Sequence, residues 1–243
     1  TPESLLGEIM GREIGSIGGV GGSMHLAQPS LGLLPTFAIV GAGIPVAAGA
    51  ALRHQVMETN DISVAVFGDG SSNIGAFHEG LNLAAIWNLP VVFICENNQY
   101  GEYSKINKTT PITDIAKRAD SYGMPGLVVD GQDLDEVVDA VTEAASAART
   151  GSGPSLLEMK TYRYAGHSRA DTAPYRPEGE FEDWYERDPI NSFRELLIGE
   201  GSLSEETNAK ILASVAERIE NAVTTVRNSP VPGIQAMFAN INA

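Results

Sequence analysis

Two short polar sequences in this chain combine residue types that bind metal ions and phosphate groups. The first is Gly68-Asp69-Gly70-Ser71, and the second is Glu96-Asn97-Asn98, whose last residue lies 29 positions after Asp69. A carboxylate and an amide oxygen suit Mg²⁺, which takes six oxygens at about 2.1 Å and usually only one or two carboxylates. A helix beginning after Gly70 would offer its free N–H groups to an anion. The residues therefore indicate a divalent cation that carries a diphosphate, without indicating which compound.

The elements around these sequences predict how the two polar ends meet. Residues 62–67 and 91–95 form short apolar runs typical of buried parallel strands, and residues 76–87 have helical periodicity between them. A right-handed βαβ crossover brings the carboxyl ends of its two strands to the same edge of the sheet. We therefore expect Asp69 and Asn98 to lie close together at that edge.

The rest of the chain continues the α/β pattern. Helices are predicted over residues 2–10, 44–57, 111–122 and 133–149, and strands over residues 127–131 and 155–159. We predict an α/β fold with a doubly wound, mostly parallel sheet and helices on both faces. Residues 1–177 would form the domain with the metal-diphosphate site, and residues 178–243 a helical extension that packs on it and at a subunit interface.

Composition excludes several classes of function. The chain has 243 residues, with 16 basic against 31 acidic side chains and a net charge of −15, which argues against nucleic acid and against anionic membrane surfaces as partners. It contains no run of eighteen apolar residues that would span a membrane. Cys95 is the one cysteine, so no disulfide framework exists and a reducing compartment is expected. We expect the bacterial cytoplasm, with the mitochondrial matrix as the alternative.

A sequence near residue 41 imitates a dinucleotide-binding fingerprint. Gly41-Ala42-Gly43 follows an apolar run, but Pro45 lies in the turn and Val46 occupies the position of the third glycine. No acidic residue ends a strand about twenty positions further on, where such a site needs one. NAD binding is therefore not predicted.

Residues 160–176 form a locally basic segment in an otherwise acidic chain. The segment combines cationic and aromatic side chains with a lone acidic residue, Asp171: Lys160, Tyr162, Arg163, Tyr164, His167, Arg169, Tyr175 and Arg176. Because it begins where a core strand ends, it is placed to meet an anion at the same sheet edge. The alternative is a solvated surface loop.

The motifs together resemble a known family. Gly-Asp-Gly followed by Asn-Asn resembles the thiamine diphosphate signature, and residues 68–100 are similar to the alpha subunit of the decarboxylating component of 2-oxo acid dehydrogenase complexes. The motifs are most similar in sequence to those of the pyruvate and acetoin enzymes. Residues 21–26 resemble the Gly-Gly-Ser-Met-His segment that borders the active-site funnel of the family, and residues 164–171 its Gly-His-Ser loop.

The resemblance implies a role for particular residues. Mg²⁺ would bind the side chains of Asp69 and Asn98 and the backbone carbonyl of Tyr100. The remaining cofactor contacts would come from backbone groups and one imidazole: the N–H groups of Gly70 and Ser71 on the diphosphate, the backbone of Ala38 and Val40 on the aminopyrimidine ring, and His167, which contacts the diphosphate and is the catalytic residue that assists acyl transfer.

Some positions leave alternatives open or depart from the family pattern. His25 is either a residue near the substrate or a free loop histidine, and Val20 stands where many relatives have lysine. Ile74 replaces a polar residue that relatives carry between Asn73 and Gly75. Relatives also have an additional N-terminal region, which supplies a Tyr-Arg pair to the diphosphate, so a processed or shortened chain is expected.

The resemblance also implies the reaction and the partners. It implies a pyruvate dehydrogenase (acetyl-transferring)-type oxidoreductase that oxidatively decarboxylates pyruvate or a similar 2-oxo acid, with thiamine diphosphate and Mg²⁺ as cofactors. Two alpha and two beta chains would form a heterotetramer, with a catalytic glutamate from the beta subunit, and would serve a lipoylated acyltransferase. The alternatives are an acetoin dehydrogenase alpha subunit, a split transketolase half and a noncatalytic homologue without cofactor.

Overall fold

A computed structural model of the protein describes residues 1–239, which fall into two compact units. One unit comprises residues 40–196, and the terminal unit combines residues 1–39 with the segment from Leu197 onwards. These units divide the chain at other positions than residue 177. The division into domains at that residue stays a prediction.

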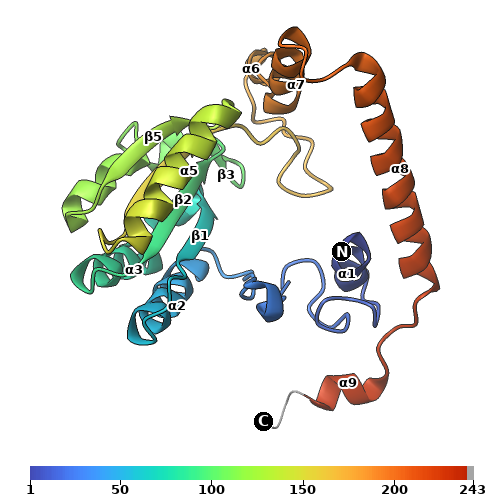
Figure 1. The fold of residues 1–243 in the computed structure, drawn as a ribbon, viewed down its shortest axis with the longest axis horizontal. Coiled ribbons are helices and arrows are strands. Elements are labelled where there is room, and N and C mark those ends of the chain that lie inside the picture. Colours follow the sequence, from blue (N-terminus) through green and yellow to red (C-terminus); the bar gives the residue numbers. More distant parts are fainter. Residues whose placement is uncertain (240–243) are drawn as a thin grey trace. The chain divides into compact units, whose positions relative to one another are not determined.

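A four-stranded parallel sheet lies at the centre of the larger unit (Figure 1). Its strands stand in the order β1 (Ser63–Gly68), β2 (Val91–Asn97), β6 (Ser155–Lys160) and β5 (Gly126–Asp130). In this register Gly68 lies beside Glu96, and Lys160 lies between Asn97 and Asp130. The carboxyl ends of all four strands therefore meet at one edge, as the sequence predicted for β1 and β2.

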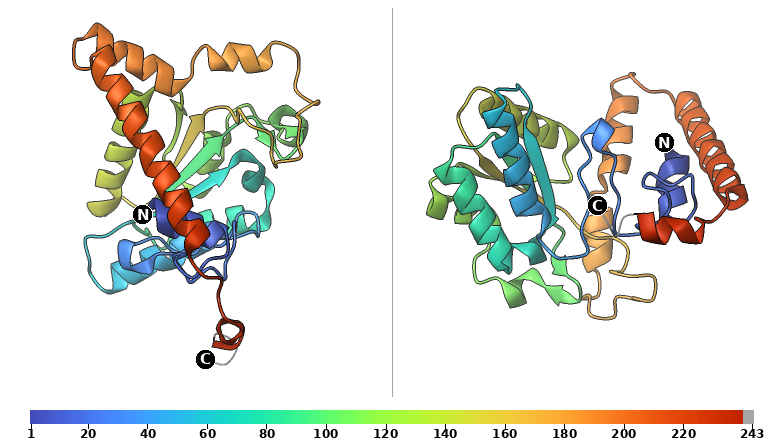
Figure 2. Two further views of the ribbon diagram at one scale, coloured as in Figure 1. Left: turned by 90° about the vertical axis from the view of Figure 1, so that its right-hand side faces the viewer. Right: turned by 90° about the horizontal axis from the view of Figure 1, so that it is seen from below.

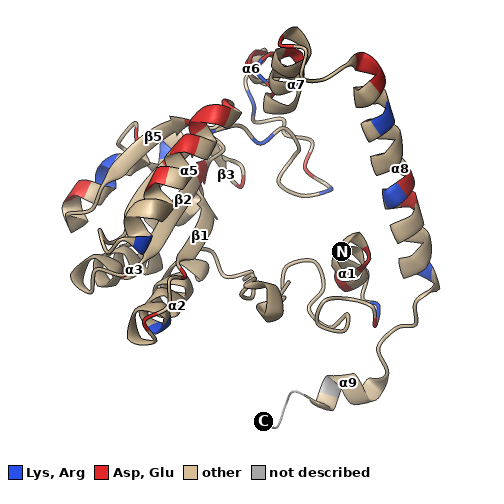
Figure 3. Cartoon of the chain, in the orientation of Figure 1, with Lys and Arg blue, Asp and Glu red and all other residues tan. Residues whose placement is uncertain are grey.

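Helices cover both faces of the sheet, which confirms the predicted doubly wound fold. On one face pack α2 (Gly43–Val56), α3 (Gly75–Ile86) and the 3₁₀ helix η3 (Ile115–Tyr122). On the other face lies α5 (Leu134–Arg149), which buries three alanines and exposes an acidic N-terminal half (Figure 3). The small alanine side chains let both layers approach the sheet closely.

The connection between β1 and α3 differs from the prediction. Residues Asp69–Asn73 form a separate 3₁₀ helix, η2, and Ile74 is extended with φ −95° and ψ 159° before α3 begins at Gly75. The predicted helix after Gly70 is therefore interrupted: the 3₁₀ helix η2 comes first, and the α-helix α3 begins only at Gly75. Two further segments are a hairpin of β3 (Tyr100–Gly101) and β4 (Ser104–Lys105), followed by α4 (Ile106–Thr109).

The predicted helix over residues 111–122 is also corrected, because only Ile115–Tyr122 is helical and it is a 3₁₀ helix. Towards the C-terminus the chain forms α6 (Glu180–Tyr185), α7 (Pro189–Gly199), α8 (Glu205–Asn228) and α9 (Ile234–Ala239). The helical nature of the C-terminal region was predicted correctly.

No helix within residues 1–239 is both long and apolar enough to cross a membrane.

In the terminal unit, α1 (Pro2–Ile9) lies beside the C-terminal half of α8, where Ala222 and Val226 are buried (Figure 2). The same unit contains the short 3₁₀ helix η1 (Pro29–Leu31). The glycine-rich segment 11–22 has no regular element, as expected. It winds instead around one side chain of α1.

That side chain is Glu8, which is fully buried. Its Oε2 accepts the N–H groups of Ile17 and Gly19, both at 2.9 Å, and its Oε1 accepts that of Gly21 at 2.6 Å. Burial alone would raise the pKa of this carboxyl, but the N–H donors outweigh it and hold the pKa below its usual value. Glu8 thus organises the segment that precedes His25.

We expect Glu8→Gln to lower the unfolding free energy of the protein by roughly 1–3 kcal/mol, because the amide nitrogen cannot accept and leaves one buried N–H without a partner. The exposed Glu13→Gln variant, in the same segment, should change it little. Urea unfolding at pH 7 measures both. Because the folded pKa of Glu8 is lowered, its contribution is complete above pH 4.5 and is lost as the pH falls below that value. Equal stability of the two variants would contradict this role.

Candidate functional site

Asp69 is the first residue of η2, directly after β1, at the edge where the strands end. Its side chain is only 1% exposed, and neither carboxylate oxygen has a hydrogen-bond partner among the described residues. A buried, unpaired carboxylate is costly, because it loses water without gaining a compensating partner. Such a group is suited to a cation that is not part of the polypeptide.

The pKa of Asp69 reflects this position. Burial is the main cause that raises it from 3.8 to about 6, while the backbone N–H groups of Asp69 and Asn98, which lie near the carboxylate without hydrogen-bond geometry, and the charge of Arg163 lower it in part. The pairing of Gly68 with Glu96 and the close approach of Gly70 to Gly101 bring the residues that follow β1 and β2 together at this edge. The predicted proximity of Asp69 and Asn98 is therefore present in the structure.

A tight turn after β2 presents the other two expected metal ligands. Asn98 Oδ1 accepts the N–H of Tyr100 at 3.2 Å, which leaves this oxygen a second lone pair. Gly101 faces Gly70 across a narrow gap, since a Cβ added at Gly70 would lie 3.2 Å from the Cα of Gly101. The two glycines thus let the turn of Asn98 and Tyr100 lie directly against the turn of Asp69.

Three of the four residues expected to contact the diphosphate and the aminopyrimidine ring through their backbone lie in or next to η2. Gly70 and Ser71 lie in η2, directly after Asp69. A Cβ at Gly41, which has φ +74°, would lie 2.1 Å from Ile74 Cδ1 and 3.8 Å from Ser71 Cβ, so Val40 is held next to η2. This contact gives Ile74 a packing role against Gly41. Ala38 lies in the terminal unit with His25, and the roles of both stay predictions.

Two arginines of the basic segment 160–176 bind groups within and beside the segment. The guanidinium of Arg176 donates to the carbonyls of Arg163, Tyr164 and Ala165. Arg163 donates to the carbonyl of Glu102 at 2.6 Å and to Tyr175 Oη at 3.0 Å. These two arginines therefore fix the shape of the segment, which leaves fewer donors for a bound anion than their number indicates.

His167 is exposed near the middle of this segment. The backbone N–H of His167 donates to Asp171 Oδ2 at 2.7 Å. The ring nitrogen Nδ1 lies 3.3 Å from Arg163 Nη1. Arginine has only donors, so Nδ1 is the acceptor and the proton of the neutral ring is on Nε2. His167 can therefore donate a hydrogen bond through Nε2.

The chain matches the family model of the dehydrogenase E1 component over residues 1–235. The chain belongs to the dehydrogenase E1 component family. It is 44% identical over 244 residues to the alpha subunit of acetoin:2,6-dichlorophenolindophenol oxidoreductase of Bacillus subtilis, covering 98% of this chain and 72% of that protein. It is 39% identical to the pyruvate dehydrogenase E1 component subunit alpha of Rickettsia bellii, covering 99% and 74% of the two chains.

A second acetoin-type alpha subunit, from Cupriavidus necator, is 39% identical over 99% of this chain and 72% of its own length. The resemblance inferred from the sequence is therefore confirmed at the level of the family. Membership of the E1 component family implies thiamine diphosphate as the cofactor. The individual site residues stay predictions.

The residues of this E1 component fit a metal-bound diphosphate at the sheet edge. Asp69 offers two unpaired oxygens, Asn98 an amide oxygen, and η2 the N–H groups of a turn. Within residues 1–239, no group of three or more His, Cys, Asp or Glu side chains gathers as a metal site would. A cation here would thus depend on one carboxylate plus amide, carbonyl and phosphate oxygens, which is the ligand preference of Mg²⁺.

One residue close to this site was missed by sequence reasoning. Glu180, at the start of α6, accepts from Tyr100 Oη at 2.5 Å and from Tyr162 Oη at 3.3 Å, and it forms an ion pair with Lys105. Its pKa is lowered because these hydrogen bonds outweigh the effect of burial, whereas burial raises the pKa of Tyr162 to about 12. Nothing in the sequence around Glu180 separates it from the neighbouring acidic residues.

We expect Glu180→Ala to loosen residues 162–180, because it removes the anchor that joins both ends of this segment to Tyr100. A loss of about 1.5–3 kcal/mol of local stability corresponds to a roughly 10- to 100-fold faster cleavage by trypsin after the exposed Arg169. The exposed neighbour Glu182→Ala is the control. Unchanged cleavage of Glu180→Ala would show that the anchor lies elsewhere.

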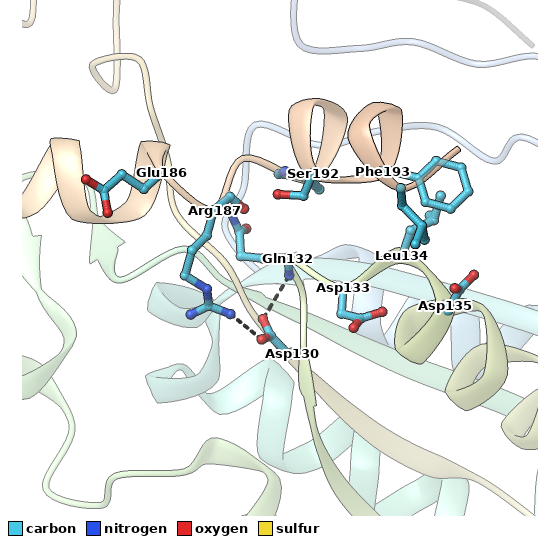
Figure 4. A pocket seen from close by; sticks show the side chains of 11 residues that line it. Asp130, Gln132, Asp133, Leu134, Asp135, Glu186, Arg187, Ser192 and Phe193 are labelled. Atoms are coloured by element: carbon cyan, nitrogen blue, oxygen red, sulfur yellow. Dashed lines mark hydrogen bonds and ion pairs between the residues drawn. The ribbon is translucent and has the colours of Figure 1, made fainter. Parts of the chain in front are cut away.

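A separate cavity of about 290 Å³ lies at the other end of the same edge, beside β5 and three strands away from β1 (Figure 4). Its walls are the start of α5 and the segment from Glu186 to Leu196, and Asp130 forms an ion pair with Arg187 at its floor. Gln132 is buried there with both ends of its amide paired. The polar groups on this floor bind one another, so the cavity does not resemble a second cofactor site.

Proposed function

We propose that this chain is the alpha subunit of a thiamine diphosphate-dependent dehydrogenase that oxidatively decarboxylates pyruvate or a similar 2-oxo acid. The observation that carries the proposal is the buried, unpaired carboxylate of Asp69, which lies beside Asn98 in a chain of the E1 component family. The names of its relatives support the same reaction class, because both pyruvate and acetoin enzymes occur among them.

In this proposal the chain positions thiamine diphosphate and neutralises the negative charge of its diphosphate. When bound, thiamine diphosphate supplies a nucleophilic carbon and an electron sink for decarboxylation. Asp69, Asn98 and the carbonyl of Tyr100 would hold Mg²⁺, while the N–H groups of Gly70 and Ser71 would meet the diphosphate. His167 would donate Nε2–H towards the diphosphate and assist acyl transfer, and the backbone of Ala38 and Val40 would hold the aminopyrimidine ring.

The proposed assembly contains two alpha and two beta chains and delivers its acyl group to a lipoylated acyltransferase. The relatives support the beta subunit, because they are named as alpha subunits. The chain alone should then be inactive, since the beta subunit would provide the remaining catalytic groups.

A coupled expression experiment tests this function. The chain is produced alone and with a beta subunit from the same source, and reduction of an artificial electron acceptor is followed with pyruvate, acetoin and branched-chain 2-oxo acids. We expect turnover of pyruvate only when both subunits are present. Pyruvate turnover by the chain alone would contradict the assembly.

Acetoin is the second candidate substrate. The 44% identity to the Bacillus subtilis acetoin-type subunit favours it specifically. In the same assay, a kcat/KM for acetoin above that for pyruvate would assign the chain to acetoin.

A further inference from the structure

Glu158 is a buried carboxylate in the inner strand β6, outside the set of expected cofactor contacts. Its side chain is completely buried, and in the register of the sheet it stands beside Cys95 of β2. Oε1 accepts from Asn97 Nδ2 at 2.6 Å and lies 2.8 Å from Lys160 Nζ. Oε2 accepts the N–H of Ala116 at 2.8 Å. Both oxygens are therefore satisfied, by partners from three elements.

The bond from Glu158 determines how the side chain of Asn97 is turned. A carboxylate only accepts hydrogen bonds, so Asn97 must direct its NH₂ group towards Glu158. Its oxygen then faces the turn that follows β2, where it accepts from the backbone N–H and from Nε2 of Gln99, both at 3.3 Å. Asn97 is itself only 1% exposed, so no solvent replaces either contact.

Gln99 lies at the bend of this turn. Its φ is +75°, in the left-handed region that residues other than glycine avoid. The two bonds to Asn97 hold it there, and the bend leads to Tyr100, whose N–H binds Asn98 Oδ1, and to Gly101, which lies against Gly70 next to Asp69. The geometry of the two expected metal ligands thus depends on a side chain that does not face the metal.

We propose that Glu158, acting through Asn97, is a positioning residue that sets the affinity of the site for its divalent cation. The inference rests on the proposed metal site at Asp69, Asn98 and Tyr100. Glu158 has no contact with the cation and affects it only by fixing the turn. Outer-shell partners of metal ligands commonly change metal affinity by about 10- to 100-fold.

The test is calorimetric titration of Mg²⁺, in the presence of thiamine diphosphate, into the complex of the full chain with its beta subunit. Asn97→Ala should raise the Kd for Mg²⁺ about 10- to 100-fold. A swapped pair, Asn97→Asp with Glu158→Gln, keeps the net charge and reverses the donor. In it the new amide donates to residue 97 and accepts from Ala116, and residue 97 still accepts from Gln99. The Lys160 ammonium, which loses its acceptor at residue 158, turns away from the new NH₂ group to its other partners, Asp114 and the carbonyl of Thr113. The swapped pair should restore a Kd within about threefold of the wild type.

Asn88→Ala is the matched control, because the side-chain amide of Asn88 also donates to a partner far away in sequence, the carbonyl of Gly151, but Asn88 precedes β2 and lies at the opposite edge of the sheet. It should lower stability and leave the Kd for Mg²⁺ unchanged. The proposal is overturned if Asn97→Ala binds Mg²⁺ as the wild type does, if Asn88→Ala weakens binding equally, or if the swapped pair does not recover.

Asp69→Ala separates this inference from the proposed function. Loss of Mg²⁺ binding in Asp69→Ala together with normal binding in Asn97→Ala would overturn only the role of Glu158. Normal binding in Asp69→Ala would overturn the metal site itself and the inference with it.

Discussion

Asp69→Asn is expected to make the metal-free protein more stable at neutral pH and to abolish its response to Mg²⁺. The ionised carboxylate is buried without a partner, and raising its pKa from 3.8 to about 6 costs at most about 3 kcal/mol of unfolding free energy when the group is charged. Asparagine removes this charge. The same change removes the one carboxylate proposed to hold the cation, so Mg²⁺ should no longer stabilise the variant.

The destabilisation by the ionised Asp69 should depend on pH. Because the folded pKa is raised, the destabilisation is complete above about pH 7, declines as the pH falls through about 6, and disappears near pH 4. Thermal or urea unfolding of wild type and variant in EDTA at pH 8 and pH 4 measures it. The exposed Asp139→Asn variant on α5 controls for a general change of charge. A variant less stable than the wild type at pH 8 would contradict the unpaired state of Asp69.

His167→Ala is expected to lower acyl transfer to a lipoylated acceptor by about 100- to 10,000-fold, the usual contribution of a positioned acid or base. Its ring is oriented by Arg163, which accounts for a free Nε2–H at this position. Reduction of an artificial acceptor bypasses the lipoyl group and should fall much less. The comparison of the two assays in the complex with the beta subunit therefore isolates the step that needs His167.

His54→Ala is the control for this prediction. His54 lies near the end of α2, where it contacts Thr59 and Asp61, and it should leave both activities unchanged. If His167→Ala keeps lipoyl-dependent activity within about twofold of the wild type, the proposed role in acyl transfer is wrong.

Much of the fold follows from local patterns in the sequence. The apolar runs over residues 62–67 and 91–95 each became a strand, and the crossover rule placed Asp69 beside Asn98 without any long-range information. The doubly wound layers followed from alternating strand and helix patterns. These predictions succeeded because hydrophobic periodicity determines both the type of each element and the face that it buries.

Features that depend on tertiary partners could not be predicted in this way. The burial of Glu158 depends on Asn97 and Ala116, which are 61 and 42 positions away in sequence. One signal was present, because a glutamate stands inside the otherwise apolar run Leu156-Leu157-Glu158-Met159. Similarly, Glu8 reads as an ordinary polar residue of a short helix until the glycine-rich segment folds around it.

The basic segment shows a limit of reading charge from composition. Its arginines favoured an anion-binding loop, yet Arg163 and Arg176 donate five hydrogen bonds to carbonyls and a tyrosine within or beside the segment. Guanidinium groups have five donors and can satisfy several carbonyls at once, so a cluster of arginines can serve to shape a loop. Sequence alone does not distinguish that use from ligand binding.

The most direct test of the account is calorimetric titration of thiamine diphosphate into the complex of this chain with its beta subunit, in Mg²⁺ and in EDTA. We predict a single class of sites in Mg²⁺ and at least about a hundredfold weaker binding in EDTA, because the buried carboxylate of Asp69 would meet the diphosphate without a cation between them. Equal binding in both buffers, or no binding in either, would contradict the proposed metal-diphosphate site.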